Sequence, residues 1–124
     1  MIALDTSAVI AYLSGEESEI AHAAQSAFDR RVACLAPVAL AELLSDPVLP
    51  ASVATLLKEL PRLEISEGYW ERAGALRAKV LAKGLKARLA DALIAQSCLD
   101  HRVPLVTADR DFRHFTRHGL DLMK

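Results

Sequence analysis

An aspartate inside an apolar stretch is the feature that most constrains this chain. Residues Leu89 to Leu99 read Leu-Ala-Asp-Ala-Leu-Ile-Ala-Gln-Ser-Cys-Leu, which is typical of a helix in a protein interior. Helical spacing puts Asp91 on the side of Ile94 and Cys98, and both sides of this helix are expected to be buried. An unpaired carboxylate there would cost several kcal/mol. Asp91 therefore needs a partner, although the helix dipole also favours an anion in the first turn without any functional role.

The order of apolar and polar segments predicts an α/β fold. Strands are expected at residues 1–4, 32–36, 63–65 and 104–107, with a possible edge strand at 120–123. Helices are expected at residues 8–13, 16–31, 37–45, 51–60, 67–83 and from residue 89 onwards. Such alternation without hairpin signals predicts a three-layer α/β/α sandwich with a mainly parallel central sheet. We expect one domain over residues 1–124, because no linker or repeat divides the chain.

The composition argues against membrane and secreted proteins. The longest apolar run, Leu35–Ala41, is too short to span a bilayer. Asp5 interrupts the apolar start, and no basic residue precedes it, so a signal peptide is not expected. Cys34 and Cys98 lie inside apolar segments, which favours buried free thiols over a disulfide or a zinc site. We expect a cytoplasmic protein with no membrane partner.

The two halves of the chain carry opposite charge. Residues 1–71 have a net charge of −7 and residues 72–124 a net charge of +6. A basic half can attract a phosphate backbone, but a solvated helix face would show the same pattern. The basic residues nearest in sequence to the C-terminal acids are Arg72, Arg77, Lys79, Lys83, Lys86, Arg88, Arg110 and Arg113. We favour Lys83, Lys86, Arg88 and Arg110 as contacts to a nucleic-acid phosphate backbone.

Two further acids follow predicted strands. Asp5 comes directly after the first strand, and Asp109 follows the strand at 104–107. Ligands of open parallel sheets bind beyond the carboxyl ends of the strands, so both carboxylates can reach one edge. Asp109 could instead only cap the next helix, and Thr6 or Ser7 could cap the helix at 8–13.

Four short motifs in this order resemble the PIN domain, particularly VapC-type ribonuclease toxins of toxin–antitoxin pairs. They are Asp5-Thr6-Ser7 after a strand, Glu42-Leu43 in a helix, Asp91-Ala92-Leu93-Ile94-Ala95, and Thr107-Ala108-Asp109-Arg110-Asp111-Phe112. The resemblance implies a catalytic Mg²⁺ site, with Mn²⁺ as a substitute, formed by Asp5, Glu42, Asp91 and Asp109. It gives Thr6, Thr107 and Asp111 supporting positions.

The chemistry of such a site agrees with this resemblance. Carboxylates that converge in one cleft repel one another unless a cation lies among them, and an all-oxygen set suits a hard divalent ion. The ion can activate a water and stabilise charge on a phosphate as the leaving oxygen departs. We therefore expect metal-dependent hydrolysis of a phosphodiester, and the resemblance implies an endoribonuclease that acts as the toxin of a type II pair. A lone Glu42 on a helix would otherwise be simply exposed.

Two other functions remain open at this point. A catalytically silent PIN-like module could bind nucleic acid or protein, although the complete acidic set argues against it. A phosphotransferase-like pocket would use Asp5 as a nucleophile, but it favours a second aspartate where Ser7 stands.

The resemblance also implies a small antitoxin partner, and either a homodimer or a hetero-oligomer with that antitoxin. Residues 38–57 carry two apolar helices interrupted by Asp46-Pro47 and Pro50. A leftover apolar groove there would suit an amphipathic helix of the antitoxin. The same helices could instead pack wholly into the core or into a homodimer interface.

Overall fold

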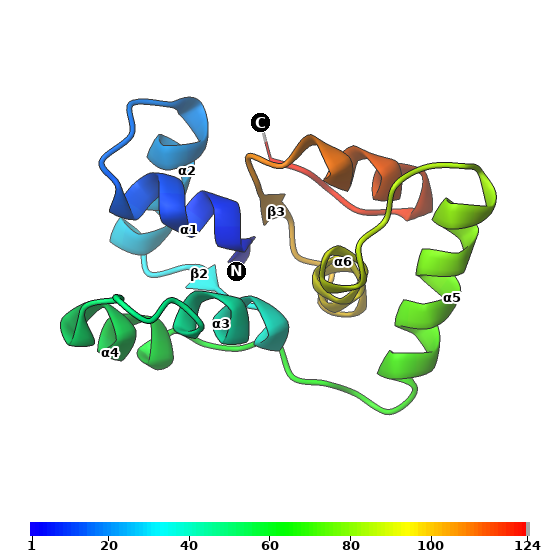
Figure 1. Cartoon of the computed structure of the whole chain (residues 1–124), viewed down its shortest axis with the longest axis horizontal. Helices are drawn as coiled ribbons and strands as arrows, with labels where there is room; N and C mark the ends of the chain where they lie inside the picture. Colours follow the sequence, from blue (N-terminus) through cyan, green and yellow to red (C-terminus); the bar gives the residue numbers. More distant parts are fainter. Residues whose placement is uncertain (124) are drawn as a thin grey trace.

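A short parallel sheet lies at the centre of the computed structural model, which describes residues 1–123 (Figure 1). Its strands are β1 (Ile2–Leu4), β2 (Ala33–Cys34) and β3 (Leu105–Val106), in the order β2-β1-β3. Both neighbouring pairs are parallel. The expected α/β class and parallel central sheet are therefore confirmed.

Two predicted strands are reduced to single bridges at the sheet edges. Leu35 forms a parallel bridge with Arg62, and Leu105 forms one with Leu122. The strand predicted at 63–65 was wrong in extent, because only Leu63 is buried and the residues after it point to solvent. The predicted edge strand at 120–123 likewise amounts to the one bridge.

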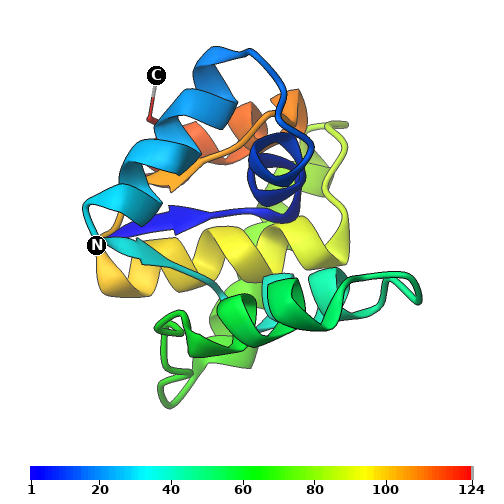
Figure 2. The same cartoon turned by 90° about the vertical axis from the view of Figure 1, so that its left-hand side faces the viewer.

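Helices cover both faces of the sheet. They are α1 (Thr6–Leu13), α2 (Glu19–Asp29), α3 (Pro37–Leu44), α4 (Ala51–Glu59), α5 (Tyr69–Ala82), α6 (Leu89–His101) and the 3₁₀ helix η1 (Arg110–His118). Helices α1 and α2 lie on one side, and α5 and α6 on the other, with α6 seen end-on (Figure 1). Turned by 90°, α6 runs along the strands (Figure 2). These layers form the expected α/β/α sandwich.

The strands are buried on both faces, so alternate residues enter different parts of the core. Ala3 and Leu105 pack in a cluster with side chains of α5, α6 and η1. Leu4 and Val106 pack in a second cluster with side chains of α1 to α4. The sheet is thereby fixed on both faces, and with it the positions of the residues that follow each strand.

Two helix starts differ from the sequence prediction. The cap of α1 is the Asp5 side chain, rather than Thr6 or Ser7. Helix α5 begins at Tyr69, after Gly68 with its left-handed φ of 81°, and not at residue 67. The Ser66 hydroxyl accepts a hydrogen bond from Arg72, which also binds the Glu67 carbonyl and pairs with Asp100.

Burial differs along α6 more than its sequence predicts: the first turn is more exposed than the rest of the helix. Ile94 and Cys98 are buried as expected, and Gln96 is only 7% exposed. Leu89, however, is 56% exposed, so the prediction that both sides of the helix are buried was wrong for the first turn. This turn lies at the carboxyl end of the sheet (Figure 2).

Both cysteines are free and buried, as predicted. Burial raises the pKa of Cys34 to about 11 and that of Cys98 to about 12, so both thiols stay protonated at neutral pH. None of the helices within residues 1–123 has the length and apolar character needed to cross a membrane.

Candidate active site

The carboxyl ends of β1 and β3 meet at the point where the chain changes from one face of the sheet to the other. After β1 the chain enters α1 on one face, whereas β3 is reached from α6 on the opposite face. Crevices at such switch points are the usual ligand sites of open α/β sheets. Asp5 follows β1, and Thr107 follows β3. The Thr107 hydroxyl donates to Asp5 Oδ2 at 2.6 Å, which joins the two strand ends directly.

Asp5 is buried, with 3% of its surface exposed, and its carboxylate accepts three hydrogen bonds. Its Oδ1 accepts the backbone N–H of Ala8 at 2.9 Å and the Ser7 hydroxyl at 2.7 Å, and its Oδ2 accepts the Thr107 hydroxyl. Burial raises the pKa of Asp5, and the nearby Asp109 raises it further, while these hydrogen bonds lower it. The carboxylate is therefore fixed in orientation by the start of α1.

Two hydroxyl groups connect the loops after β1 and β3. Ser7 Oγ accepts the N–H of Ala108 at 3.0 Å, and Thr107 Oγ1 accepts the N–H of Asp109 at 3.0 Å. The two hydroxyl oxygens are 3.3 Å apart. Sequence reasoning treated Ser7 only as a possible cap and missed this link. The signal available was its place two residues after a strand-end aspartate.

Asp109 does cap the helix that follows it. Its Oδ1 accepts the N–H of Asp111 at 2.9 Å, at the start of η1. The other oxygen, Oδ2, accepts no hydrogen bond from residues 1–123. Capping and participation in the acidic cluster are therefore compatible.

Asp91 has an unsatisfied oxygen. Its Oδ2 is buried and has no hydrogen-bond partner among residues 1–123. Burial, followed by the charges of Asp109, Asp5 and Glu42, raises the pKa of Asp91 to about 6, and Arg88 opposes this shift. All four acids singled out in the sequence are thus close enough to influence one site.

Glu42 lies exposed on α3 and faces α1. The Thr6 hydroxyl donates to Glu42 Oε1 at 2.8 Å. Asp111, in contrast, lies near the basic loop before α6, with its Oδ2 3.7 Å from Lys86 Nζ. The Thr6 side chain therefore contacts one of the four acids directly, whereas the Asp111 side chain lies beside a lysine.

The residue types present suit a divalent cation, but the described side chains do not form a complete coordination site. Within residues 1–123, no three Asp, Glu, His or Cys side chains come close enough together to hold an ion. The buried, unpaired Asp91 Oδ2 nevertheless needs a positive partner, and the surrounding donors are carboxylate oxygens, which Mg²⁺ and Mn²⁺ prefer. The cluster of Asp5, Glu42, Asp91 and Asp109 is here called the acidic cluster.

The basic residues divide into two groups. Lys83, Lys86, Arg88 and Arg110 are exposed. Arg72 Nη2 donates to Asp100 Oδ2 at 2.7 Å, and Arg77 Nε donates to the Ala87 carbonyl at 2.8 Å. Arg72 and Arg77 therefore act in holding α5 to its neighbours.

Comparisons with known proteins agree with this architecture. The chain matches the PIN domain over residues 2–117. No curated protein matches the sequence. VapBC2 from Rickettsia felis, solved with a DNA fragment from its promoter, contains a chain that is 22% identical, with a TM-score of 0.75 and coverage of 99% of this chain and 98% of that one.

Two further solved structures have the same fold. FitAcB from Neisseria gonorrhoeae is 18% identical, with a TM-score of 0.71 and coverage of 100% of this chain and 97% of that one. FitAB bound to an IR36 DNA fragment is 17% identical, with a TM-score of 0.68 and coverage of 99% and 94%. The match to the domain and the likeness of fold extend over nearly the whole sequence, and the chain belongs to the PIN domain family.

Proposed function

We propose that this chain is a divalent-metal-dependent endoribonuclease and the toxin of a type II toxin–antitoxin pair. PIN domains are generally nucleases that use divalent metals. The observation that carries the proposal is the buried, unpaired Asp91 Oδ2 beside three other acids at the carboxyl edge of β1 and β3. The complete acidic set, with one buried oxygen unpaired within residues 1–123, argues against a catalytically silent module.

Asp5, Glu42, Asp91 and Asp109 would hold the ion, which is proposed to be Mg²⁺, with Mn²⁺ able to replace it. When bound, such an ion lowers the pKa of the attacking water and stabilises charge on the phosphate. Thr107 and Ser7 orient Asp5, and Thr6 orients Glu42, so these hydroxyls fix the orientation of two of the four carboxylates.

The reaction itself is hydrolysis of a phosphodiester bond. Water attacks phosphorus, one P–O bond to a ribose breaks, and the leaving oxygen gains a proton. A carboxylate must accept the proton that the water loses, since none of the four acidic-cluster residues is a histidine.

The experiment that tests this function is cleavage of defined tRNA, rRNA and mRNA pools by the purified chain with Mg²⁺, Mn²⁺ or EDTA. We expect cleavage with either metal, none in EDTA, and products without a 2′,3′-cyclic phosphate, because water is the nucleophile. The Asp91→Asn variant, purified in parallel, controls for a contaminating ribonuclease. Cyclic phosphate ends, or equal cleavage in EDTA, would contradict the proposal.

An antitoxin helix is proposed to dock in an apolar hollow of about 370 Å³ between α1, α3 and α4. Ile10 and Leu13 of α1 are 55% and 38% exposed there, and Leu43 and Val53 also line it. Thr6 and Glu42 stand at the same hollow, so a bound helix would reach the acidic cluster. A basic side chain of that helix could then compete with the metal, because either cation relieves the same repulsion.

A further inference from the structure

A second hollow opens on the other side of the acidic cluster. It encloses about 480 Å³, within the range of about 300–1,000 Å³ that is usual for ligand pockets. Its lining comes from the end of β3, from η1 and from the last part of the described chain: Thr107, Ala108, Asp109, Arg110, Arg113, Thr116, Leu122 and Met123. We call it the flanking hollow.

The flanking hollow combines two cations with an apolar floor. Arg110 and Arg113 are exposed, and neither forms an ion pair with another of residues 1–123. Leu122 and Met123 supply the apolar floor, and Asp109 is the single acid in the lining. These groups complement a nucleotide: the arginines can bind its anionic phosphate, and the apolar side chains can contact the flat face of its base.

The hollow is also continuous with the acidic cluster. Asp109 belongs to both, and Thr107 lines the hollow while its hydroxyl binds Asp5. A ligand seated here would therefore lie next to the bond that the cluster is proposed to cleave.

We infer that the flanking hollow binds the RNA nucleotide adjacent to the cleaved phosphodiester. The base lies on Leu122 and Met123, and its phosphate contacts Arg110 and Arg113. This inference rests on the proposed function, because it takes RNA as the substrate of the neighbouring acidic cluster.

The floor of the hollow is fixed by the sheet before any ligand binds. Met123 N–H donates to the Leu105 carbonyl at 2.9 Å, and Leu122 forms a parallel bridge with Leu105. The Thr116 hydroxyl already donates to the Arg113 carbonyl at 2.8 Å. The hollow therefore recognises a base by its size and apolar face, and the expected preference at this nucleotide is for shape over hydrogen-bonding pattern.

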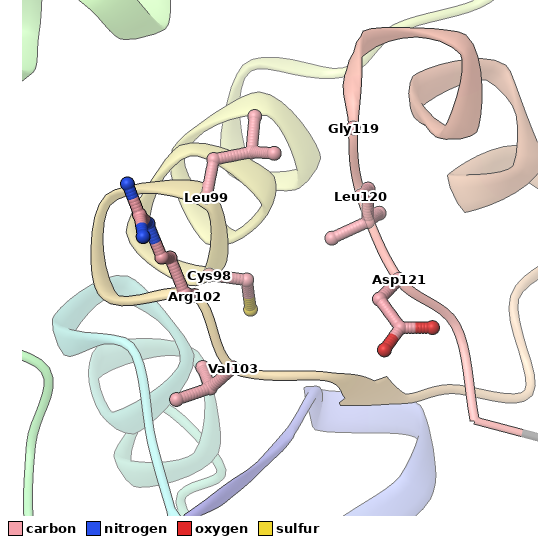
Figure 3. A pocket seen from close by; sticks show the side chains of 7 residues that line it. All are labelled: Cys98, Leu99, Arg102, Val103, Gly119, Leu120 and Asp121. Carbon is pink, nitrogen blue, oxygen red and sulfur yellow. The ribbon is translucent and has the colours of Figure 1, made fainter.

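Another hollow, of about 200 Å³, does not offer the same chemistry (Figure 3). It lies between the last turns of α6 and residues 119–121, where Leu120 and Asp121 face Cys98 and Val103. It is at the opposite end of α6 from Asp91, so a ligand there would not reach the acidic cluster.

Binding can be measured without catalysis. The full chain, in EDTA, is titrated with nucleoside 5′-monophosphates, with ribose 5-phosphate and with nucleosides, while the methyl NMR signals of Met123 and Leu122 are followed. We expect these signals to move with the nucleotides and to move much less with ribose 5-phosphate, which lacks the base. No movement with any nucleotide would overturn the inference.

Arg113→Gln tests the phosphate contact, and Arg117→Gln on the same 3₁₀ helix is its control, since Arg117 does not line the flanking hollow. Loss of one phosphate contact to single-stranded RNA should lower the slope of log K against log salt by about 0.7. We expect that decrease for Arg113→Gln only. Equal slopes for the two variants would overturn the phosphate contact.

Met123→Ala tests the base contact through the bases found next to the cut in a random RNA pool. We expect a changed base frequency at one flanking position, and an unchanged frequency for Arg117→Gln.

If the wild type cleaves but no variant alters these frequencies or the slope, the inference fails while the proposed function stands. If the wild type does not cleave, the proposed function fails, and the NMR titration still reports whether the hollow binds nucleotides. A methyl shift that depends only on protein concentration would show a protein contact and would contradict RNA binding.

Discussion

At the scale of single residues, the most unusual feature is a buried carboxylate oxygen that accepts no hydrogen bond from the described part of the chain. Asp91 was singled out from sequence because it stands among apolar residues, and its buried Oδ2 is unpartnered within residues 1–123. The hydroxyl groups around Asp5 could not be assigned in the same way. Whether Ser7 caps a helix or bridges two loops depends on where β3 ends, and that position is set by tertiary packing.

Removing the charge of Asp91 should change how stability depends on pH. An unfolded aspartate titrates near 3.9, whereas burial and neighbouring acids raise the folded pKa of Asp91 to about 6. Between these values the folded state holds more protons, so its contribution to the free energy of unfolding falls as pH rises, and the loss is complete above the folded pKa. Asp91→Asn should therefore be more stable than wild type by about 1–2 kcal/mol at neutral pH in EDTA, after allowance for solvent screening.

Urea unfolding of both proteins near the lower end of that window and above it, at about pH 4.5 and about pH 7.5, measures the difference. The gap between the two proteins should widen with rising pH. A gap that is constant, or that narrows, would show that Asp91 is not destabilised by ionisation in the folded state.

Thr107→Val should weaken the site through Asp5. The change removes the donor to Asp5 Oδ2 and the acceptor for the Asp109 N–H. Loss of such a supporting contact commonly lowers metal affinity or activity by about 10–100-fold. The acid side of the pH–activity profile should also move to higher pH, since a lost hydrogen bond raises the pKa of Asp5 further. Thr107→Ser should restore both properties; if it does not, the hydroxyl is not the cause.

At the scale of helices and strands, periodicity and end signals placed most elements to within a few residues. Helix α4 was predicted from its two flanking prolines, and α6 from its apolar pattern. The strands at 63–65 and 120–123 were less predictable, because pairing depends on which partner edge is available. Arg62 and Leu122 each form a single parallel bridge, and Glu64, Ile65 and Asp121 nearby are exposed.

The loop between α5 and α6 is the element expected to guide RNA. Lys83 and Lys86 are both exposed, although Lys86 Nζ lies 3.7 Å from Asp111. If both lysines touch phosphate, Lys83→Ala with Lys86→Ala should lower the slope of log K against log salt by up to about 1.4. Arg30→Ala with Lys58→Ala makes the same charge change outside the basic half and should leave the slope unaltered. Equal slopes for the two double variants would mean that the lysines only face solvent.

At the scale of the whole molecule, four motifs from distant parts of the chain meet because the sheet places β1 between β2 and β3. The alternation of strands and helices was enough to predict the fold class, and the positions of Asp5 and Asp109 after predicted strands indicated one common edge of the sheet. Neither could predict the hollows on either side. These depend on how completely α1, α3, α4 and η1 cover one another, which is a property of side-chain volumes in three dimensions.

A partner that fills the apolar hollow should protect the turn between α3 and α4. Val48 in that turn is 82% exposed, so its neighbourhood should exchange amide hydrogens quickly in the free chain. In a complex isolated by co-expression with the neighbouring small open reading frame, exchange over residues 38–57 should slow, and exchange over α5 should not. Full protection of residues 38–57 in the free chain would contradict this docking surface.

Substitution separates docking from folding. Leu13→Glu places a charge in the apolar hollow and should weaken partner binding, whereas Leu81→Glu changes a leucine of similar exposure, 38% against 44%, on α5. Partner binding that is lost equally in both variants would indicate a general effect on the fold.

The central claim is that the acidic cluster holds a divalent ion with which the chain cleaves RNA. The most direct test is calorimetric titration of Mn²⁺ into wild type and Asp91→Asn, paired with RNA cleavage by the same preparations. Wild type should bind Mn²⁺ and release protons at about pH 5.5 but few at about pH 7.5, because Asp91 must lose its proton to bind the ion. Asp91→Asn should lose that proton release, most of the affinity and all cleavage. Cleavage by Asp91→Asn at the wild-type rate, in Mg²⁺ or Mn²⁺, would contradict the assignment.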